Sequence, residues 1–269
     1  MKTSGLSLVS AVQRRKPARE RLQSMDFIAE RPIQRAARSK SDGGVFYTEA
    51  GLYAILKNIP LFSSLTQSDL ATVSRHAVTK TFPKNAIIIN EGDTTDSLYV
   101  ILSGRVKAFL SDEQGREIIL DIEGLGDYFG EIALLDEPPR SASVMTLESS
   151  RFSIISKNDF KKCLANNPDI AIALIKELTH RIRMLTDNVK GLALRDVYGR
   201  VAKTLSNLAK REENGKRVIA EKFTQQELAN MVGASREMVS RILKDLTTGG
   251  YIKIEDKRII IQRKLPAGW

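Results

Sequence analysis

The residue types best suited to chemistry lie close together between Phe129 and Ala142. Gly130 lets the backbone approach a ligand, Arg140 offers a two-pronged guanidinium for a phosphate, and Ser141 adds hydroxyl and amide donors. A short helix after Gly130 would turn unpaired N–H groups toward the same anion. Glu131 beside an anion site is explained if its carboxylate accepts a hydrogen bond from a ribose 2′-hydroxyl. Phosphate and ribose together predict a nucleotide, and the alternative is a structural ion pair between Arg140 and Glu131.

A second set of polar residues shares the exposed face of a predicted helix near the C-terminus: Arg236, Glu237, Ser240 and Arg241. An arginine can bridge O6 and N7 of guanine, and a carboxylate can accept a hydrogen bond from N4 of cytosine. Because Glu237 and Arg241 are four residues apart, they can also simply pair with each other. Residues 191–269 carry 16 Lys and Arg against 9 Asp and Glu, which favours binding to a polyanion.

The segment from 224 to 246 has the pattern of a helix-turn-helix. Thr224 and Ser235 are typical helix caps, and Gly233 between them supplies the positive φ of a tight turn. Apolar residues recur at helical spacing in both helices: Leu228, Ala229, Val232, Val239, Ile242, Leu243 and Leu246. Two further runs, Tyr251–Ile254 and Arg258–Gln262, predict a hairpin placed like the wing of a winged helix domain.

Composition excludes several classes of protein. The chain has 269 residues, a net charge of +10 and a single cysteine, so it cannot form an intramolecular disulfide framework or a multi-cysteine metal site. Its two histidines, His76 and His180, leave little for a metal centre or a Ser-His-Asp triad. It has no run of about 18 apolar residues that would predict a membrane span. We therefore expect a cytoplasmic protein that is not an enzyme, holds no metal and does not enter a membrane.

The chain divides into parts by its patterning. Residues 1–46 are basic and lack a sustained apolar period, which predicts a disordered extension, either an inert tail or an arm that contacts nucleic acid. Short apolar runs separated by glycine turns predict a sandwich or barrel of the jelly-roll kind: Ala86–Asn90, Ser97–Leu102, Arg105–Leu110, Glu117–Ile122, Ser143–Thr146 and Arg151–Ile155. The expected boundaries are 47–165 for this domain, 166–195 for a long helix and hinge, 196–264 for the helix-turn-helix domain and 265–269 for a tail.

The predicted long helix follows Pro168 and carries a seven-residue apolar repeat. β-Branched residues fill one heptad position and leucines the other: Ile175, Ile182 and Val189, and Leu178, Leu185 and Leu192. This choice of residues favours a parallel two-stranded coiled coil, and the alternative is a helix buried on its own domain. The stretch from Gly191 to Arg195 then predicts a joint before a second amphipathic helix that starts near Asp196.

Residues 50 to 264 resemble the CRP/FNR superfamily of bacterial transcription regulators, and within it the cyclic AMP receptor protein branch. The resemblance rests on Gly92-Asp93, Ser103-Gly104, Phe129–Ala142, Asp196–Arg200 and Gly233–Arg241. It implies an α+β fold with a cyclic-nucleotide-binding β-roll of the jelly-roll type, a long dimerisation helix and a C-terminal winged helix-turn-helix. The single Cys163 excludes the iron–sulfur branch.

The resemblance also implies which residues make contacts. The cyclic nucleotide would contact Gly130, Glu131, Ile132, Ala133, Arg140, Ser141, Ala142, Arg181 and Thr186. DNA would contact Thr224, Gln225, Ser235, Arg236, Glu237, Ser240, Arg241 and Lys244. In the receptor branch two adjacent hydroxyl residues contact adenine. Those positions hold Leu185 and Thr186 here, so one hydroxyl is missing.

The sequence thus predicts a homodimer that binds a palindromic, TGTGA-like DNA site under the control of a cyclic nucleotide, with cyclic AMP preferred. Two alternatives keep this architecture but respond to cyclic di-GMP or bind DNA without a ligand. A third is an enzyme or regulatory subunit that merely carries a nucleotide-binding domain, and the helix-turn-helix speaks against it. The family further implies RNA polymerase as a partner and association with the nucleoid.

Overall fold

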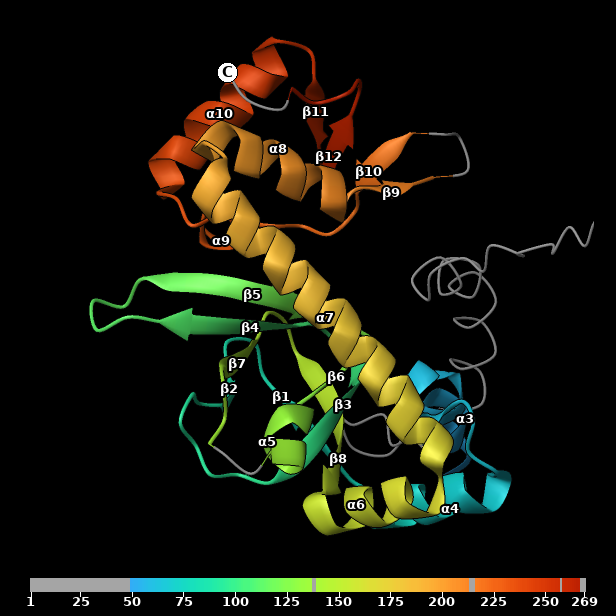
Figure 1. Cartoon of the computed structure of the whole chain (residues 1–269). Coiled ribbons are helices and arrows are strands. Elements are labelled where there is room, and N and C mark those ends of the chain that lie inside the picture. The colour runs from blue at the N-terminus through green and yellow to red at the C-terminus, as the bar shows by residue number, and fades with distance from the viewer. Residues whose placement is uncertain (1–48, 137–138, 213–215, 257, 267–269) are drawn as a thin grey trace, which may run out of the picture.

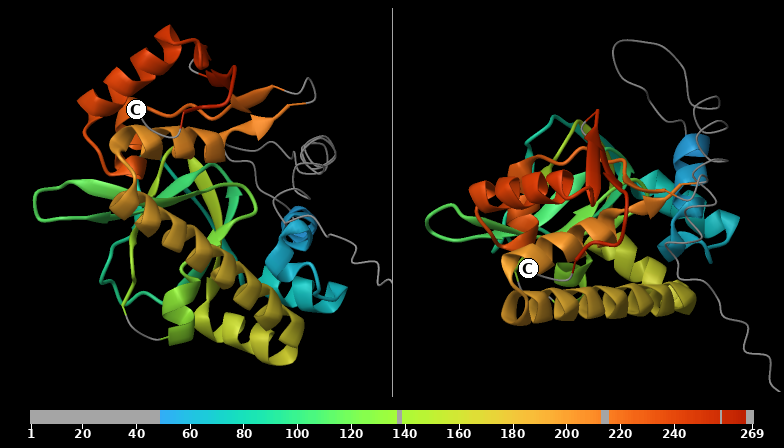
Figure 2. Two further views of the ribbon diagram at one scale, coloured as in Figure 1. Left: turned by 45° about the horizontal axis from the view of Figure 1, so that its top comes forward. Right: turned by 90° about the horizontal axis from the view of Figure 1, so that it is seen from above.

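The computed structural model describes residues 49–136, 139–212, 216–256 and 258–266, and these contain three antiparallel four-stranded sheets (Figures 1 and 2). Two sheets form a β-roll, and the third belongs to a smaller C-terminal domain. The helix α7 (Pro168–Leu194) runs from one to the other. The predicted extension over residues 1–46 lies outside the described residues, as do the last residues of the predicted tail.

The β-roll consists of sheets with the strand orders β1-β8-β3-β6 and β2-β7-β4-β5. Its strands are β1 (Val78–Phe82), β2 (Ile87–Ile89), β3 (Ser97–Ser103), β4 (Val106–Ser111), β5 (Glu117–Glu123), β6 (Tyr128–Phe129), β7 (Ser143–Thr146) and β8 (Ser150–Ser156). All six predicted apolar runs form strands. The other two strands give no such signal, because β1 is a largely exposed edge strand and β6 has two residues.

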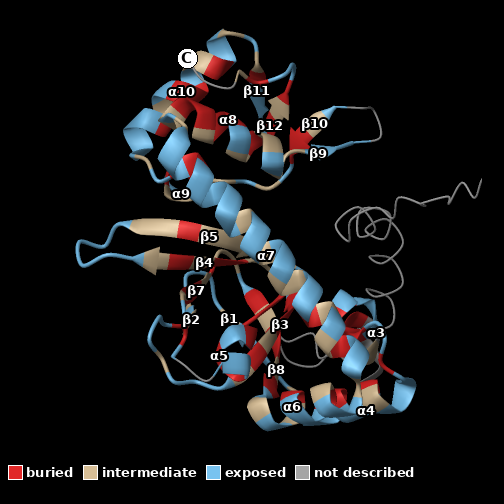
Figure 3. Cartoon of the chain, viewed as in Figure 1, coloured by how far each residue is buried: buried red, intermediate tan, exposed pale blue. Residues whose placement is uncertain are grey.

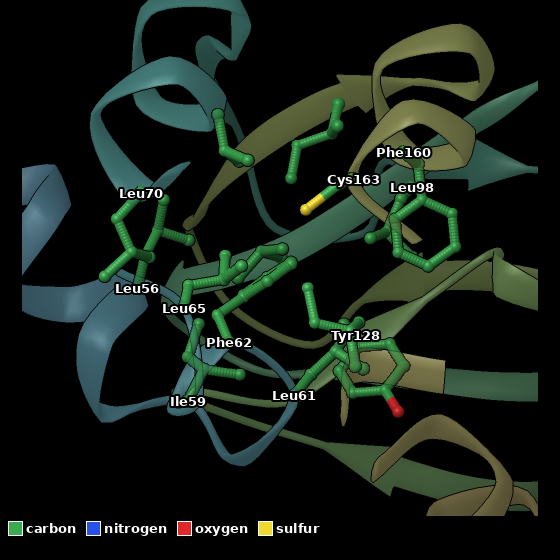
Figure 4. Close-up of a cluster of buried hydrophobic side chains, with 14 of the residues drawn as sticks. Leu56, Ile59, Leu61, Phe62, Leu65, Leu70, Leu98, Tyr128, Phe160 and Cys163 are labelled. Atoms are coloured by element: carbon green, nitrogen blue, oxygen red, sulfur yellow. The ribbon is translucent and has the colours of Figure 1, made fainter. Parts of the chain in front are cut away.

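Short helices pack on one side of the β-roll: α3 (Glu49–Asn58), the 3-10 turn η1 (Pro60–Phe62), α4 (Gln67–His76) and α6 (Lys157–Asn166). Thr66 and Ser156 begin α4 and α6 by accepting hydrogen bonds from backbone N–H groups three residues on. Their apolar faces form one buried cluster with β3 and β6 (Figure 4). Cys163 lies in this cluster, as a small buried apolar residue would.

The long helix α7 packs on the β-roll mainly through its first turns, where Ile170 and Leu174 are buried. Farther along, most of its surface is exposed in the single chain (Figure 3). The helix continues through Gly191 and ends at Leu194, so the joint is narrower than the predicted stretch from Gly191 to Arg195. Arg195 leaves the helical conformation, and the Asp196 side chain caps the next helix. Glycine adopts helical as well as loop conformations, so Gly191 by itself does not mark the end of the helix.

The C-terminal domain contains the predicted helix-turn-helix and wing. Its elements are α8 (Val197–Leu208), β9 (Lys210–Arg211), β10 (Arg217–Ile219), α9 (Gln225–Val232), α10 (Arg236–Thr248), β11 (Ile252–Glu255) and β12 (Arg258–Ile261). The wing strands β11 and β12 join β10 and β9 in one sheet. The three helices and this sheet enclose a separate apolar core. The predicted α+β fold, with a β-roll, a long helix and a C-terminal helix-turn-helix, is confirmed.

The C-terminal domain rests on the β-roll through α9 and β5. Asn230 on α9 donates a hydrogen bond of 2.9 Å to Glu117 Oε2 on β5, and the same carboxylate pairs with Lys107 on β4. Close to this contact, an added Cβ at Gly233 would lie 3.1 Å from the Leu192 side chain of α7. The helix-turn-helix, the long helix and the β4–β5 hairpin therefore meet at one place.

Candidate functional site

A cavity of about 420 Å³ lies between the β-roll and α7. Its walls come from β5, the segment around the short helix α5 (Glu131–Asp136), and the middle of α7. Eight of the nine residues predicted to contact the nucleotide line it: Gly130, Glu131, Ile132, Ala133, Arg140, Ser141, Ala142 and Arg181. The ninth, Thr186, does not line it. It is exposed, and its hydroxyl donates to the Ile182 carbonyl one turn back on α7.

The Arg140 guanidinium is fixed by three hydrogen bonds to protein groups. Its Nε donates to Thr95 Oγ1 at 3.0 Å, its Nη1 to the Gly130 carbonyl at 2.6 Å, and its Nη2 to the Ser97 carbonyl at 2.8 Å. Burial lowers the pKa of Arg140, but an arginine starts so high that it stays charged. Each Nη atom carries a second N–H, so a guanidinium held in one orientation keeps two donors for an anion.

Gly130 permits this arrangement. Its φ of +89° lies in the left-handed region, and a Cβ there would approach Arg140 Nη1 to 2.6 Å and the Ser97 carbonyl to 2.8 Å. Glycine is therefore required because the backbone approaches the Arg140 guanidinium, and not, as expected from the sequence, because the backbone approaches a ligand.

A buried polar cluster stands beside Arg140 in the cavity wall. Arg181 on α7 reaches Glu131 Oε1 with Nη1 and Glu123 Oε1 with Nη2, both at 2.8 Å. Arg181 Nη2 also donates to the Tyr128 carbonyl at 2.9 Å. The ion pair between Arg140 and Glu131, which was the alternative to a nucleotide site, is not formed, because the cation that pairs with Glu131 is Arg181.

The two carboxylates have unusual surroundings. Only 1% of the Glu131 surface and 4% of the Glu123 surface are exposed. Burial raises the pKa of Glu131, and it raises the pKa of Glu123 well above its usual value, while Arg181 opposes both shifts. One oxygen of each carboxylate, Oε2, has no hydrogen-bond partner among the described residues. A buried acceptor without a partner is what a ligand hydroxyl would satisfy.

Two features of this site were not predicted from the sequence: the buried carboxylate of Glu123 and the place of apolar α7 residues in the cavity wall. Glu123 ends a strand, where a charged residue is ordinarily assigned to the turn that follows, and nothing local indicates that it is buried. Leu178, Ile182 and Leu185 line the cavity although their spacing assigned them to the coiled-coil seam. Leu178 packs against the core of the β-roll. An apolar α7 residue can therefore face the cavity, its own domain or a second helix, and periodicity does not separate these roles.

The predicted DNA-contacting residues gather at the helix-turn-helix. Thr224 and Glu227 form a capping box at the start of α9, Gly233 ends that helix with a φ of +60°, and Ser235 caps α10. Gln225 begins α9 on the exposed surface, and Ser240 is half-buried. The charged members, Arg236, Glu237, Arg241 and Lys244, are exposed along α10. In the part of the chain that the structure describes, Glu237 and Arg241 form no ion pair with each other.

Five of the six predicted seam residues on α7 are exposed in the single chain: Ile175, Ile182, Leu185, Val189 and Leu192. Their exposed fractions run from 43% to 65%, which is large for apolar residues at heptad spacing on one helix. Over the described ranges, no helix has the length and apolar character to cross a membrane, and no three His, Cys, Asp or Glu side chains gather as a metal site would need.

Comparison with known proteins places both domains. Residues 79–167 match the cyclic nucleotide-binding domain family, and residues 199–264 match the Crp-like helix-turn-helix domain family. A CRP-like cAMP-activated global transcriptional regulator of Mycobacterium tuberculosis is 35% identical over 210 residues, which is 77% of this chain and 94% of that protein. The cAMP-activated global transcriptional regulator CRP of Escherichia coli is 36% identical over 186 residues, 67% of this chain and 87% of that protein.

Among solved structures, the c-di-GMP responsive global regulator CLP of Xanthomonas campestris superposes with a TM-score of 0.62 at 25% identity. The match covers 73% of this chain and 99% of CLP. The members of this family are transcription regulators and not enzymes. The match extends through both domains and over most of each relative, and the chain therefore belongs to the CRP/FNR family of cyclic-nucleotide-binding transcription regulators.

Proposed function

We propose that the chain is a homodimeric transcription regulator that binds a palindromic, TGTGA-like DNA site under the control of cyclic AMP. One observation carries the proposal: the cavity between the β-roll and α7 combines an oriented guanidinium, Arg140, with a buried carboxylate, Glu131, that has an oxygen to spare. A phosphate suits the first group and a ribose hydroxyl the second. The position of α7 in the cavity wall links this ligand to the DNA-binding domain.

Cyclic AMP is proposed as the effector because the Mycobacterium tuberculosis and Escherichia coli relatives are named as cAMP-activated. The cavity volume falls within the range of about 300–1,000 Å³ that is usual for small-molecule sites. Cyclic di-GMP is the second candidate, since the structurally similar CLP is described as c-di-GMP responsive. Leu185 at the cavity wall offers no hydroxyl to a base, so the phosphate and ribose contacts would supply most of the polar recognition.

Dimerisation is proposed to bury the exposed apolar stripe of α7. Burying a fully exposed large aliphatic side chain contributes about 1.5–3 kcal/mol. These five residues are 43–65% exposed, so each contributes about half of that, and the ten side chains of two helices together offset much of a cost of association on the order of 4–15 kcal/mol.

For DNA binding, we propose that α10 lies in the major groove with Arg236, Glu237 and Arg241 against base edges. Thr224, Gln225, Ser235, Ser240 and Lys244 would contact phosphates or fix the register. The proposed domains are 47–165, 166–195 and 196–264, supported by the family matches over 79–167 and 199–264. From family membership we also propose that the protein acts in the cytoplasm on nucleoid DNA and that it contacts RNA polymerase.

Isothermal titration calorimetry tests the effector assignment. The full chain is titrated in parallel with cyclic AMP, cyclic GMP and cyclic di-GMP, and the same titrations are made with Arg140→Ala. We expect cyclic AMP to bind most tightly and Arg140→Ala to remove binding. Arg116→Ala is the matched control. Arg116 is an exposed arginine of the β4–β5 turn that pairs with Asp112, and it does not line the cavity. Unchanged nucleotide affinity in Arg140→Ala would contradict the assignment.

A further inference from the structure

The buried cluster beside Arg140 contains one more carboxylate than an ion pair needs. Arg181 Nη1 donates to Glu131 Oε1, whereas Arg181 Nη2 is engaged by Glu123 Oε1 and the Tyr128 carbonyl. Asp121 and Glu177 add further negative charge near Arg181, so Arg181 is the cation that this group of acids shares. A second buried carboxylate is expensive to desolvate, and its presence calls for a reason beyond charge balance.

The way Arg181 is divided between the two acids has a consequence for Glu131. A guanidinium beside a single carboxylate tends to form two parallel hydrogen bonds, one to each carboxylate oxygen. Here Glu131 receives only the Nη1 bond, and its Oε2 has no partner among the described residues. Because Glu123 and the Tyr128 carbonyl hold Nη2, Arg181 is kept from covering both oxygens of Glu131.

Glu123 is well placed to hold Arg181 in this way. It ends β5 and pairs in register with Val106 of the neighbouring strand β4, so its backbone position is fixed by the sheet. Only 5% of its side chain is exposed. Arg181 also lies over the Tyr128 ring, with its Cζ 5.6 Å from the ring centroid, which limits rotation of the guanidinium.

We propose that Glu123 is a positioning residue of the effector site, which holds Arg181 Nη2 so that Glu131 Oε2 stays available for a ligand hydroxyl. The inference rests on the proposed function, in which Glu131 accepts from the ribose 2′-hydroxyl of a cyclic nucleotide. Without Glu123, the Arg181 fork closes on Glu131 and occupies the oxygen that the hydroxyl would use.

The discrimination between cyclic AMP and 2′-deoxy cyclic AMP tests this inference by calorimetry on the full chain. Wild type should bind the ribonucleotide about 10- to 100-fold more tightly, the value of a hydrogen bond to a charged acceptor. Glu123→Met, which is similar in shape but cannot accept the bond, should lose most of this ratio by weakening the ribonucleotide alone. Glu123→Gln should keep most of it, because its amide oxygen still accepts from Arg181 Nη2.

Glu177→Gln is the matched control. Its carboxylate lies 3.9 Å from Arg181 Nε but is partly exposed and holds neither Nη atom, so the ratio should stay at the wild-type value. Thermal unfolding establishes that each variant is folded. If Glu123→Met does not fold, Glu123→Leu replaces it, and the same loss of discrimination is expected.

Three results would overturn parts of this account separately. A folded Glu123→Met or Glu123→Leu protein with the wild-type ratio overturns the role of Glu123. Equal binding of the two nucleotides by wild type overturns both that role and the hydroxyl contact of Glu131, while control by a cyclic nucleotide stands. No binding of either nucleotide by wild type overturns the inference together with cyclic AMP as the effector.

Discussion

Replacing Gly130 with alanine should both destabilise the β-roll and disable the anion site. The φ of +89° costs an alanine about 1–2 kcal/mol. The new Cβ would also meet Arg140 Nη1 at 2.6 Å and the Ser97 carbonyl at 2.8 Å, and neither can retreat freely. Ser97 belongs to β3, and Nη1 is tied to the Gly130 carbonyl by a charge-assisted bond worth about 1.5–3 kcal/mol. The free energy of unfolding should therefore fall by about 3–5 kcal/mol.

Thermal unfolding of the unliganded chain measures this effect. A loss of that size should lower the Tm by roughly 6–20 °C. Gly115→Ala is the matched control, since Gly115 has a φ of +75° but no atom within 4 Å of an added Cβ, so it should cost only the backbone strain of about 1–2 kcal/mol. Cyclic AMP binding should be lost in Gly130→Ala and kept in Gly115→Ala. Equal loss of stability in the two variants, with nucleotide binding intact in both, would refute the crowding argument.

Three further predictions concern the dimer, the DNA contact and pH. Ile182→Glu puts a charge into the apolar stripe of α7 and should raise the dimer Kd by a factor on the order of 100 or more. Light scattering measures the dimer, and the control Lys190→Glu on the same helix should stay dimeric. Arg241→Ala should cost about 1–3 kcal/mol on the specific site and relax specificity at one base pair, and an equal loss on random DNA would make it a phosphate contact. Because the pKa values of Glu123 and Glu131 are raised from 4.5, the folded chain binds more protons than the unfolded chain as pH rises past 4.5, and their contribution to stability falls over that range. Chemical denaturation at several pH values should show a shallower decline in Glu123→Gln than in wild type, and identical slopes would count against the raised pKa of Glu123.

Much of the fold follows from local sequence signals. Thr224, Gly233 and Ser235 set the ends of the two helices of the helix-turn-helix, since a cap or a positive φ depends only on neighbouring residues. Strands that combine apolar residues with glycine turns were predictable for the same reason. The edge strand Val78–Phe82 was not, because its residues are mostly exposed and its partners on β8 lie 68 to 76 positions away in the sequence.

The candidate site was predictable in its members and less so in its contacts. Residue types pointed to Gly130, Glu131 and Arg140, and all three line the cavity. The ion pair of Glu131 with Arg181 was not predicted, because Arg181 comes from a helix 50 residues later and no local pattern places it there. Glu123 was missed because its burial and its ion pair with Arg181 of α7 are properties of the tertiary structure.

The contact between the two domains also could not be predicted from the sequence. Asn230 and Glu117 are 113 residues apart, and nothing in the sequence around either one distinguishes it from an ordinary polar surface residue. Their hydrogen bond joins α9 to the β5 strand whose other end carries Glu123. A ligand that moves α7 or β5 would thus act on the helix-turn-helix directly, provided it prefers one arrangement over the other.

The most direct test of the account is fluorescence anisotropy of a labelled duplex with a TGTGA-like palindrome, titrated with the full chain with and without cyclic AMP. Cyclic AMP should tighten DNA binding by the wild type and should have no effect on DNA binding by Arg140→Ala. A DNA affinity of the wild type that stays the same when the nucleotide is saturating would contradict this expectation.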